Sequence, residues 1–151
     1  MAKNYSLYAV PAYYLLAMLP QLYATSLIKC SATFDNAAPR SQAFQDKLKE
    51  KCSPADFARI ERAKAAHANS LESFPLITVA LVTGTFAGLP ATSLNLAGAI
   101  LLALRAIHSL LYINTQILSL SYARTLVWIS SRIVALNILF KVAFKVADEG
   151  L

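Results

Sequence analysis

A charged, amide-bearing segment runs directly into an apolar one in the middle of this chain. Residues 61–75 are Glu-Arg-Ala-Lys-Ala-Ala-His-Ala-Asn-Ser-Leu-Glu-Ser-Phe-Pro, and the apolar segment Leu76–Ala87 follows without a break. A continuous helix through both segments places Asn69 and Glu72 at membrane depth. Polar groups at that depth are costly unless they bind a partner, so they indicate a functional site.

The composition is that of a membrane protein. The chain has 151 residues, 57% of them hydrophobic, and a mean hydropathy of +0.50. Three apolar segments reach the roughly 20 residues that a helix needs to cross a bilayer, and a fourth begins amphipathic. We therefore predict an all-α fold, an integral membrane four-helix bundle that forms a single domain over residues 1–151. Its helices are expected at about 5–28, 54–88, 92–119 and 122–147.

The distribution of Lys and Arg predicts the orientation. The first apolar segment is longer than the roughly 7–15-residue core of a signal peptide, so we expect it to remain in the chain. Basic residues gather in and around the loop between the first two helices and are few at the opposite end. By the positive-inside rule this multi-pass protein has its first loop in the cytosol and both termini across the membrane.

Other function classes fit the sequence poorly. The formal net charge is +6, but the basic residues form neither a solvated face nor a patch interleaved with aromatic residues, so we expect no nucleic-acid partner. Cys30 and Cys52 flank the first loop, and two cysteines in a reducing compartment do not make a disulfide framework. Two Cys and two distant His are also too few ligands for a metal site, and we predict none.

Polar residues share one face on each of the last three predicted helices. In the second helix, Arg62 and Asn69 are seven residues apart and Glu72 lies three further on, whereas His67 points nearly opposite to Asn69, toward a neighbouring helix or the lipid interface. The third helix carries Arg105, His108 and Tyr112 on one face. In the fourth, Arg124 and Trp128 are four residues apart, with Thr125 beside them and Arg132 two turns on.

Two interpretations of these faces are open. One is an internal network in which Glu72 pairs with Arg105, Asn69 bridges helices and Tyr112 lies at the headgroup belt. The other is an anionic ligand, because Glu72 can neutralise only one of the three intramembrane arginines. The excess of positive charge favours the ligand.

The same residues resemble the MAPEG family, the membrane-associated proteins of eicosanoid and glutathione metabolism. The segment Glu61-Arg62 … Ala66-His67-Ala68-Asn69 … Glu72 … Pro75 is similar to the family's second-helix signature. Further similarity comes from Arg105-Ala106-Ile107-His108 … Tyr112 in the third helix, Tyr122-Ala123-Arg124-Thr125 at the start of the fourth, and Asp35-Asn36 … Pro39-Arg40 in the first loop. The resemblance covers nearly the whole chain, and the second helix is its most specific part.

The resemblance implies a homotrimer with glutathione bound between neighbouring subunits near the cytosolic side of a microsomal, endoplasmic reticulum membrane. It implies that Asn69 and Glu72 hold the backbone and amino group of glutathione, that Arg124 stabilises the thiolate, and that Thr125 assists it. We thus expect Arg124 and Thr125 to be catalytic. The expected glutathione-binding residues are Arg62, Asn69, Glu72, Arg105, His108, Tyr112 and Trp128.

Three positions depart from the family pattern. Ala65 and Ala68 stand where catalytic relatives often have arginines that clamp the carboxylates of glutathione, and Trp128 replaces a tyrosine of the prostaglandin E synthase branch. Positive charge could come instead from Lys29, Arg62, Lys64 or a loop lysine.

The resemblance therefore predicts a membrane-bound glutathione-dependent transferase or peroxidase that acts on a lipophilic electrophile. One alternative is a glutathione-independent isomerase or cyclase of a lipophilic metabolite, with His108 or Tyr112 as the acid–base group. The other is a non-catalytic lipid-binding membrane protein.

Overall fold

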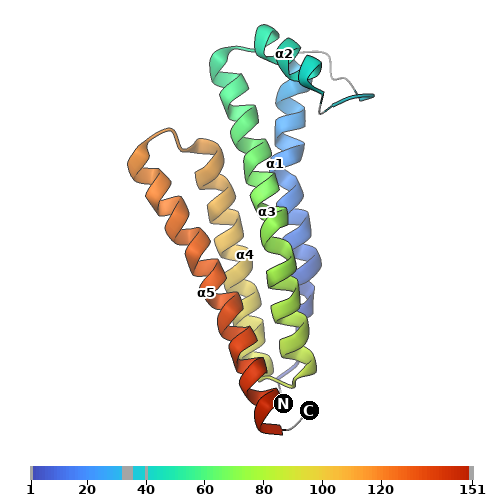
Figure 1. Cartoon of the computed structure of the whole chain (residues 1–151), viewed down its shortest axis with the longest axis vertical. Coiled ribbons are helices and arrows are strands. Elements are labelled where there is room, and N and C mark those ends of the chain that lie inside the picture. Colours follow the sequence, from blue (N-terminus) through green and yellow to red (C-terminus); the bar gives the residue numbers. More distant parts are fainter. Residues whose placement is uncertain (1, 32–35, 40, 150–151) are drawn as a thin grey trace.

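Four long helices run side by side in the computed structural model of the chain, which describes residues 2–31, 36–39 and 41–149 (Figure 1). The helical elements are a 3-10 turn η1 (Ser6–Tyr8), α1 (Ala9–Ser31), α2 (Gln42–Lys51), α3 (Pro54–Phe86), α4 (Ala91–Asn114) and α5 (Leu118–Glu149). These described residues contain no strand, which confirms the all-α prediction. Asp35 and Arg40 of the first loop lie outside the described residues, as does the side chain of Cys30.

Local sequence signals define both ends of α3. The Ser53 hydroxyl accepts a hydrogen bond from the Asp56 amide at 3.1 Å and donates one to the Asp56 carboxylate at 2.7 Å, so this serine caps the start of the helix. At the other end, the Gly88 and Leu89 amides donate to the Thr85 and Gly84 carbonyls, at 3.1 and 3.0 Å. Gly88 has a φ of 66°, the left-handed conformation that this C-terminal cap requires.

The first loop contains a helix that was predicted as loop. Ser41 caps α2 by accepting a hydrogen bond from the Phe44 amide at 3.2 Å. Phe44 and Leu48 are one helical turn apart and both are buried, together with Ile28 of α1 and Ile60 of α3. This apolar contact ties α2 across the ends of α1 and α3, at the top of Figure 1.

Other helix boundaries differ from the prediction by several residues. A 3-10 turn precedes α1, which begins at Ala9 rather than at residue 5, so Pro11 falls in the first turn, where its missing amide costs no helical hydrogen bond. Helix α4 ends at Asn114 rather than at residue 119, and α5 begins at Leu118 rather than at residue 122. The break lies at the polar sequence Asn-Thr-Gln, where Thr115 is extended (φ −79°, ψ 123°).

Helix α3 contacts α1, α4 and α5, so it is central to the packing. A core cluster that includes Tyr13, Leu81, Leu94 and Ile138 joins the four long helices toward the end that carries η1 and the end of α5. This arrangement places the charged half of α3 near the opposite end, beside the end of α4 and the start of α5 (Figure 1).

Among the described residues, two stretches are long and apolar enough to cross a membrane: Ala91–Asn114 and Leu120–Glu149. Large apolar side chains also lie on the outer surface of the helices; in α5, Leu126 is 65% exposed and Phe144 is 69% exposed. Such surfaces are costly in water and suit lipid or a neighbouring subunit.

Candidate functional site

A pocket of about 210 Å³ opens between α3, α4 and α5. Every residue that lines it belongs to the predicted site, and we refer to it as the polar pocket. Its lining residues are Asn69 of α3, His108 and Tyr112 of α4, and Arg124, Thr125 and Trp128 of α5. The three-helix packing thus brings together residues that are up to 59 positions apart, from 69 to 128.

Arginine side chains lie over aromatic rings at and beside this pocket. The guanidinium carbon of Arg124 is 4.2 Å from the centre of the Tyr112 ring, and that of Arg132 is 4.6 Å from the Trp128 ring. Such stacking holds a cation in place without neutralising it. Thr125 is exposed at the pocket and donates its hydroxyl hydrogen to the Ser121 carbonyl at 3.1 Å.

Arg105 lies beneath the polar pocket rather than in its lining. Only 2% of the residue is exposed, and its guanidinium donates to the hydroxyls of Ser70 and Ser73 of α3, at 3.2 and 2.9 Å. It also lies 5.2 Å from the Tyr13 ring of α1. Arg105 therefore binds two serines and an aromatic ring, and the proposed pairing with Glu72 does not occur.

The hydrogen bond between Arg105 and His108 determines which ring nitrogen of the histidine carries the proton. Arg105 Nη1 is 3.2 Å from His108 Nδ1, and a guanidinium can only donate. His108 Nδ1 is therefore the acceptor, and this bond assigns the ring proton to Nε2. With Arg105 on its Nδ1, His108 offers a hydrogen-bond donor, its Nε2–H, to the polar pocket.

Two residues that line the polar pocket, and Arg132 stacked on one of them, each have a buried polar atom with no hydrogen-bond partner within the described part of the chain. These atoms are Asn69 Oδ1, Trp128 Nε1 and Arg132 Nη1. Buried polar groups are nearly always paired, because an unpaired group loses its bond to water without replacement. An acceptor and two donors therefore remain free where Asn69 and Trp128 line the pocket.

Arg62 and Glu72 are not among the residues that line the polar pocket. Arg62 Nε donates to the Ile113 carbonyl at 2.9 Å, in the last turn of α4. Glu72 is exposed, and the one ion pair found among the described residues joins Lys145 and Glu149. His67 contacts a neighbouring helix as predicted, with Nδ1 2.7 Å from the Ala17 carbonyl of α1.

Ala68, one of the two alanines that stand at the positions of the missing arginines, is not in the lining of the polar pocket. Ala68 lines a separate pocket of about 570 Å³ between α1, α2 and α3, together with Lys64 and His67. Lys64 donates to Gln45 of α2 at 3.1 Å. It lies in the polar first part of α3, where burial lowers its pKa from the ordinary 10.5 and nearby Glu61 partly offsets that effect. Lys64 is thus the cation that shares a pocket with Ala68.

Ser70, Ser73 and Tyr13 contact Arg105 and were not among the predicted site residues. Ser70 and Ser73 are three residues apart on one face of α3, and that spacing was the available signal. Their hydroxyls also donate to helix carbonyls, Ala66 and Asn69, so each oxygen is left free to accept from Arg105.

The fold and the pocket together define an all-helical membrane protein with a cationic, aromatic-lined site. Comparison with protein families gives a match to the MAPEG family over residues 8–144, and the chain belongs to that family. It is therefore a membrane protein of the kind that acts in glutathione and eicosanoid metabolism. Searches of curated proteins and of solved structures gave no match.

Proposed function

We propose that this protein is a membrane-bound glutathione-dependent transferase or peroxidase that acts on a lipophilic electrophile, with glutathione held in the polar pocket. The observation that carries the proposal is the set of positive charges in and around this pocket: Arg124 lines it, Arg105 contacts its residue His108, and Arg132 stacks on its residue Trp128. Arg105, Arg124 and Arg132 stack on aromatic rings, and none has a carboxylate within ion-pair distance among the described residues. A tripeptide with two carboxylates and an ionisable thiol supplies the missing negative charge.

The size of the polar pocket supports an assembly in which a neighbouring subunit completes the site. Ligand pockets usually enclose about 300–1,000 Å³. At about 210 Å³, the polar pocket of one chain is smaller than that range. We propose that it is half of a site between subunits of a homotrimer, that all four long helices cross the membrane, and that the site faces the cytosol at the endoplasmic reticulum.

Each pocket residue has a defined part in this proposal. Asn69, with its free Oδ1, and His108, with its proton on Nε2, offer an acceptor and a donor to the backbone of the tripeptide. Trp128 and Arg132 add donors that have no other partner. Glu72 and Arg62 lie outside the polar pocket of one chain. In the proposed trimer, a neighbouring subunit brings the ligand to Glu72.

Arg124 is the candidate for lowering the pKa of the bound thiol. When bound, glutathione supplies a thiolate nucleophile, and an unperturbed thiol has a pKa of about 8.5. A cation held close to it in a partly desolvated site lowers that pKa by about 1–3 pH units. Arg124 remains charged in such surroundings, where a lysine could lose its proton. The exposed Thr125 hydroxyl beside it donates a second hydrogen bond to sulfur when it rotates away from the Ser121 carbonyl, to which it donates in the structure.

The test is the variant Arg124→Ala, assayed for conjugation of an aryl halide with glutathione. We expect kcat/KM at neutral pH to fall by about 10–1,000-fold, because the thiol then ionises without help. The variant should regain part of this loss as the pH rises toward the unassisted thiol pKa, and it should keep the oligomeric state of the wild type.

A matched control is Arg59→Ala, which removes an exposed arginine from the first turns of α3, away from the pocket. This variant should have wild-type activity. Wild-type turnover in Arg124→Ala would remove Arg124 from the mechanism, and equal losses in both variants would indicate a general effect of charge.

One observation favours a glutathione-independent isomerase or cyclase as a second candidate. Because Arg105 donates to His108 Nδ1, the neutral histidine presents its Nε2–H to the pocket and is arranged to polarise a substrate oxygen by a hydrogen bond rather than to accept a proton. This candidate also accounts for Ala65 and Ala68. It predicts that millimolar glutathione leaves the melting temperature unchanged, whereas a specific ligand raises it.

A further inference from the structure

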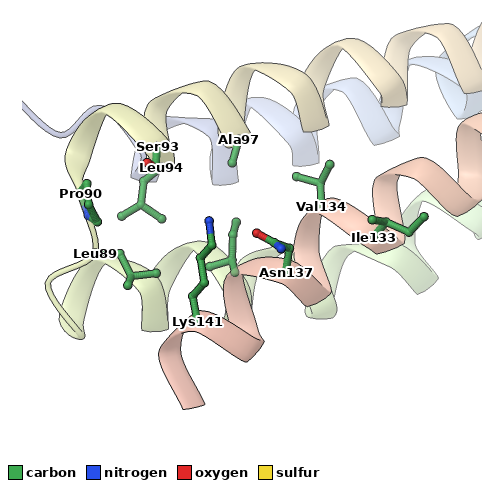
Figure 2. Close-up of a pocket in the computed structure, with 10 residues that line it drawn as sticks. Leu89, Pro90, Ser93, Leu94, Ala97, Ile133, Val134, Asn137 and Lys141 are labelled. Atoms are coloured by element: carbon green, nitrogen blue, oxygen red, sulfur yellow. The ribbon is translucent and has the colours of Figure 1, made fainter. Parts of the chain in front are cut away.

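An apolar groove of about 470 Å³ lies between the first half of α4 and the second half of α5 (Figure 2). It is at the opposite end of these helices from the polar pocket, and we call it the α4–α5 groove. Leu94 and Ala97 of α4 face Val134 and Ile138 of α5 across it. Its volume falls within the range of about 300–1,000 Å³ that is typical of ligand pockets, which are also mostly apolar.

The α4–α5 groove has few polar groups, and one of them is charged. Its lining is apolar apart from Ser93, Asn137 and Lys141. Figure 2 shows the side chains of Asn137 and Lys141 extending from α5 toward α4, with the Lys141 amine directed into the space between the helices. Two of the three polar groups therefore come from α5, and Ser93 lies on the facing wall formed by α4.

Lys141 is a cation for which the described part of the chain provides no counter-ion. No hydrogen bond or ion pair joins it to any residue within 2–31, 36–39 or 41–149. Lys145, one turn further along α5, is different: its amine lies 3.6 Å from Glu149 Oε1 and donates to the Gly88 carbonyl at 3.3 Å. The charge of Lys145 is thus neutralised, whereas the charge of Lys141 remains available to an anion.

The groove lies where the apolar surface of the helices meets a polar end. Phe140 and Phe144 flank Lys141 on α5 and are 61% and 69% exposed. Nearby, hydrogen bonds link Asn4 to Thr85 and Asn95 to the Lys3 carbonyl, at 3.3 and 2.9 Å. Lysines at such a boundary extend their amines toward the headgroups of the bilayer, and anionic headgroups attract them.

We propose that the α4–α5 groove binds an acyl chain of an anionic phospholipid, with the phosphate of its headgroup on Lys141. The apolar walls of the groove enclose the acyl chain and separate it from the surrounding lipid. Asn137 and Ser93 provide further hydrogen bonds to the headgroup region. The site uses none of the residues of the polar pocket, so it does not depend on the proposed reaction.

The first test measures thermal stability of the full chain in detergent, with phosphatidylglycerol or with phosphatidylcholine of the same acyl chains. We expect phosphatidylglycerol to raise the melting temperature by a few degrees with saturation, as a specific ligand does, and phosphatidylcholine to raise it less. Lys141→Gln should remove the difference between the two lipids, and the matched control Lys145→Gln should keep it.

The proposal is wrong if Lys141→Gln keeps the full response to phosphatidylglycerol, or if both lipids stabilise the wild type equally. It is also wrong if Lys145→Gln loses as much of the response as Lys141→Gln, since the effect would then be one of general surface charge.

A second test locates the chain directly. Phosphatidylglycerol with a photoreactive diazirine in its acyl chain should label peptides that contain residues 89–97 and 133–141, and Ala97→Phe, which fills the groove, should reduce that labelling. Labelling confined to other segments would overturn the proposal. So would a change of oligomeric state in Ala97→Phe, because a second copy of the chain would then be the occupant.

Discussion

At the scale of single residues, the main feature of this protein is that three arginines have no carboxylate partner among the described residues. Arg105 is almost fully buried and contacts two serine hydroxyls, a histidine nitrogen and a tyrosine ring. Arg124 and Arg132 each stack on one ring. Aromatic faces and hydroxyls stabilise a guanidinium but leave its net charge in place, and the electrostatic attraction for an anion is stronger where water is excluded.

The planar guanidinium of Arg105, with its several N–H donors, leads to a stability prediction. Arg105→Lys keeps the charge, but a lysine cannot reach Ser70, Ser73 and His108 together, because its donors radiate from one nitrogen. We expect the free energy of unfolding in detergent, without glutathione, to fall by about 1–3 kcal/mol. The same substitution at exposed Arg59 is the control and should change stability by less than about 0.5 kcal/mol. Equal melting temperatures for Arg105→Lys and the wild type would contradict the structure of this network.

Sequence spacing found the lining of the polar pocket better than its supporting contacts. Asn69, His108, Tyr112, Arg124, Thr125 and Trp128 were all expected at the site, because the family resemblance named them and helical periodicity places most of each set on one face. The predicted partner of Arg105 was wrong: the sequence suggested Glu72, whereas in the structure Arg105 donates to Ser70 and Ser73. Periodicity fixes a face of one helix but not which face of the next helix it meets.

At the scale of helices, caps and glycines determine how α3 packs. The C-terminal cap at Gly88 turns the chain into α4, and Gly84 one turn earlier lets α4 and α5 approach closely. A Cβ atom at Gly84 would lie 2.8 Å from Leu94 Cδ2 and 3.0 Å from Ile138 Cγ2. Both neighbours are buried in the core cluster, so neither can move without disturbing the packing around it.

Gly84→Val should therefore destabilise the protein. We expect a loss of about 1–3 kcal/mol from overpacking, measured by chemical or thermal unfolding in detergent. Gly84→Ala should cost less, because the smaller side chain gains helix propensity of about 0.5–1 kcal/mol relative to Gly. Stability that rises from Gly to Ala to Val would show that Leu94 and Ile138 do not pack closely against this position.

Helix starts with a capping serine and a following acid could be predicted, and Ser53 is the example. Helix α2 could not be identified as easily, since its ten residues are strongly polar and Phe44 and Leu48 are the two that are buried against α1 and α3. The break between α4 and α5 was placed too late because apolar residues continue through it. The polar sequence from Asn114 to Gln116 was the better signal.

At the scale of the whole molecule, the two ends of the helices have different chemistry. The charged half of α3, helix α2 and the polar pocket lie toward one end, and the α4–α5 groove with Lys141 lies toward the other. The family assignment and the exposed apolar surfaces agree with a membrane setting. Oligomerisation was expected only from the resemblance, because no sequence period marks which surface a neighbouring copy covers.

A structure determined in detergent with glutathione present tests the central claim most directly. We predict density for the tripeptide at a boundary between subunits, with its sulfur beside the Arg124 guanidinium and its backbone within hydrogen-bond distance of Asn69. Neighbouring subunits that fill the polar pocket with their own side chains, leaving glutathione no space beside Arg124, would contradict the account.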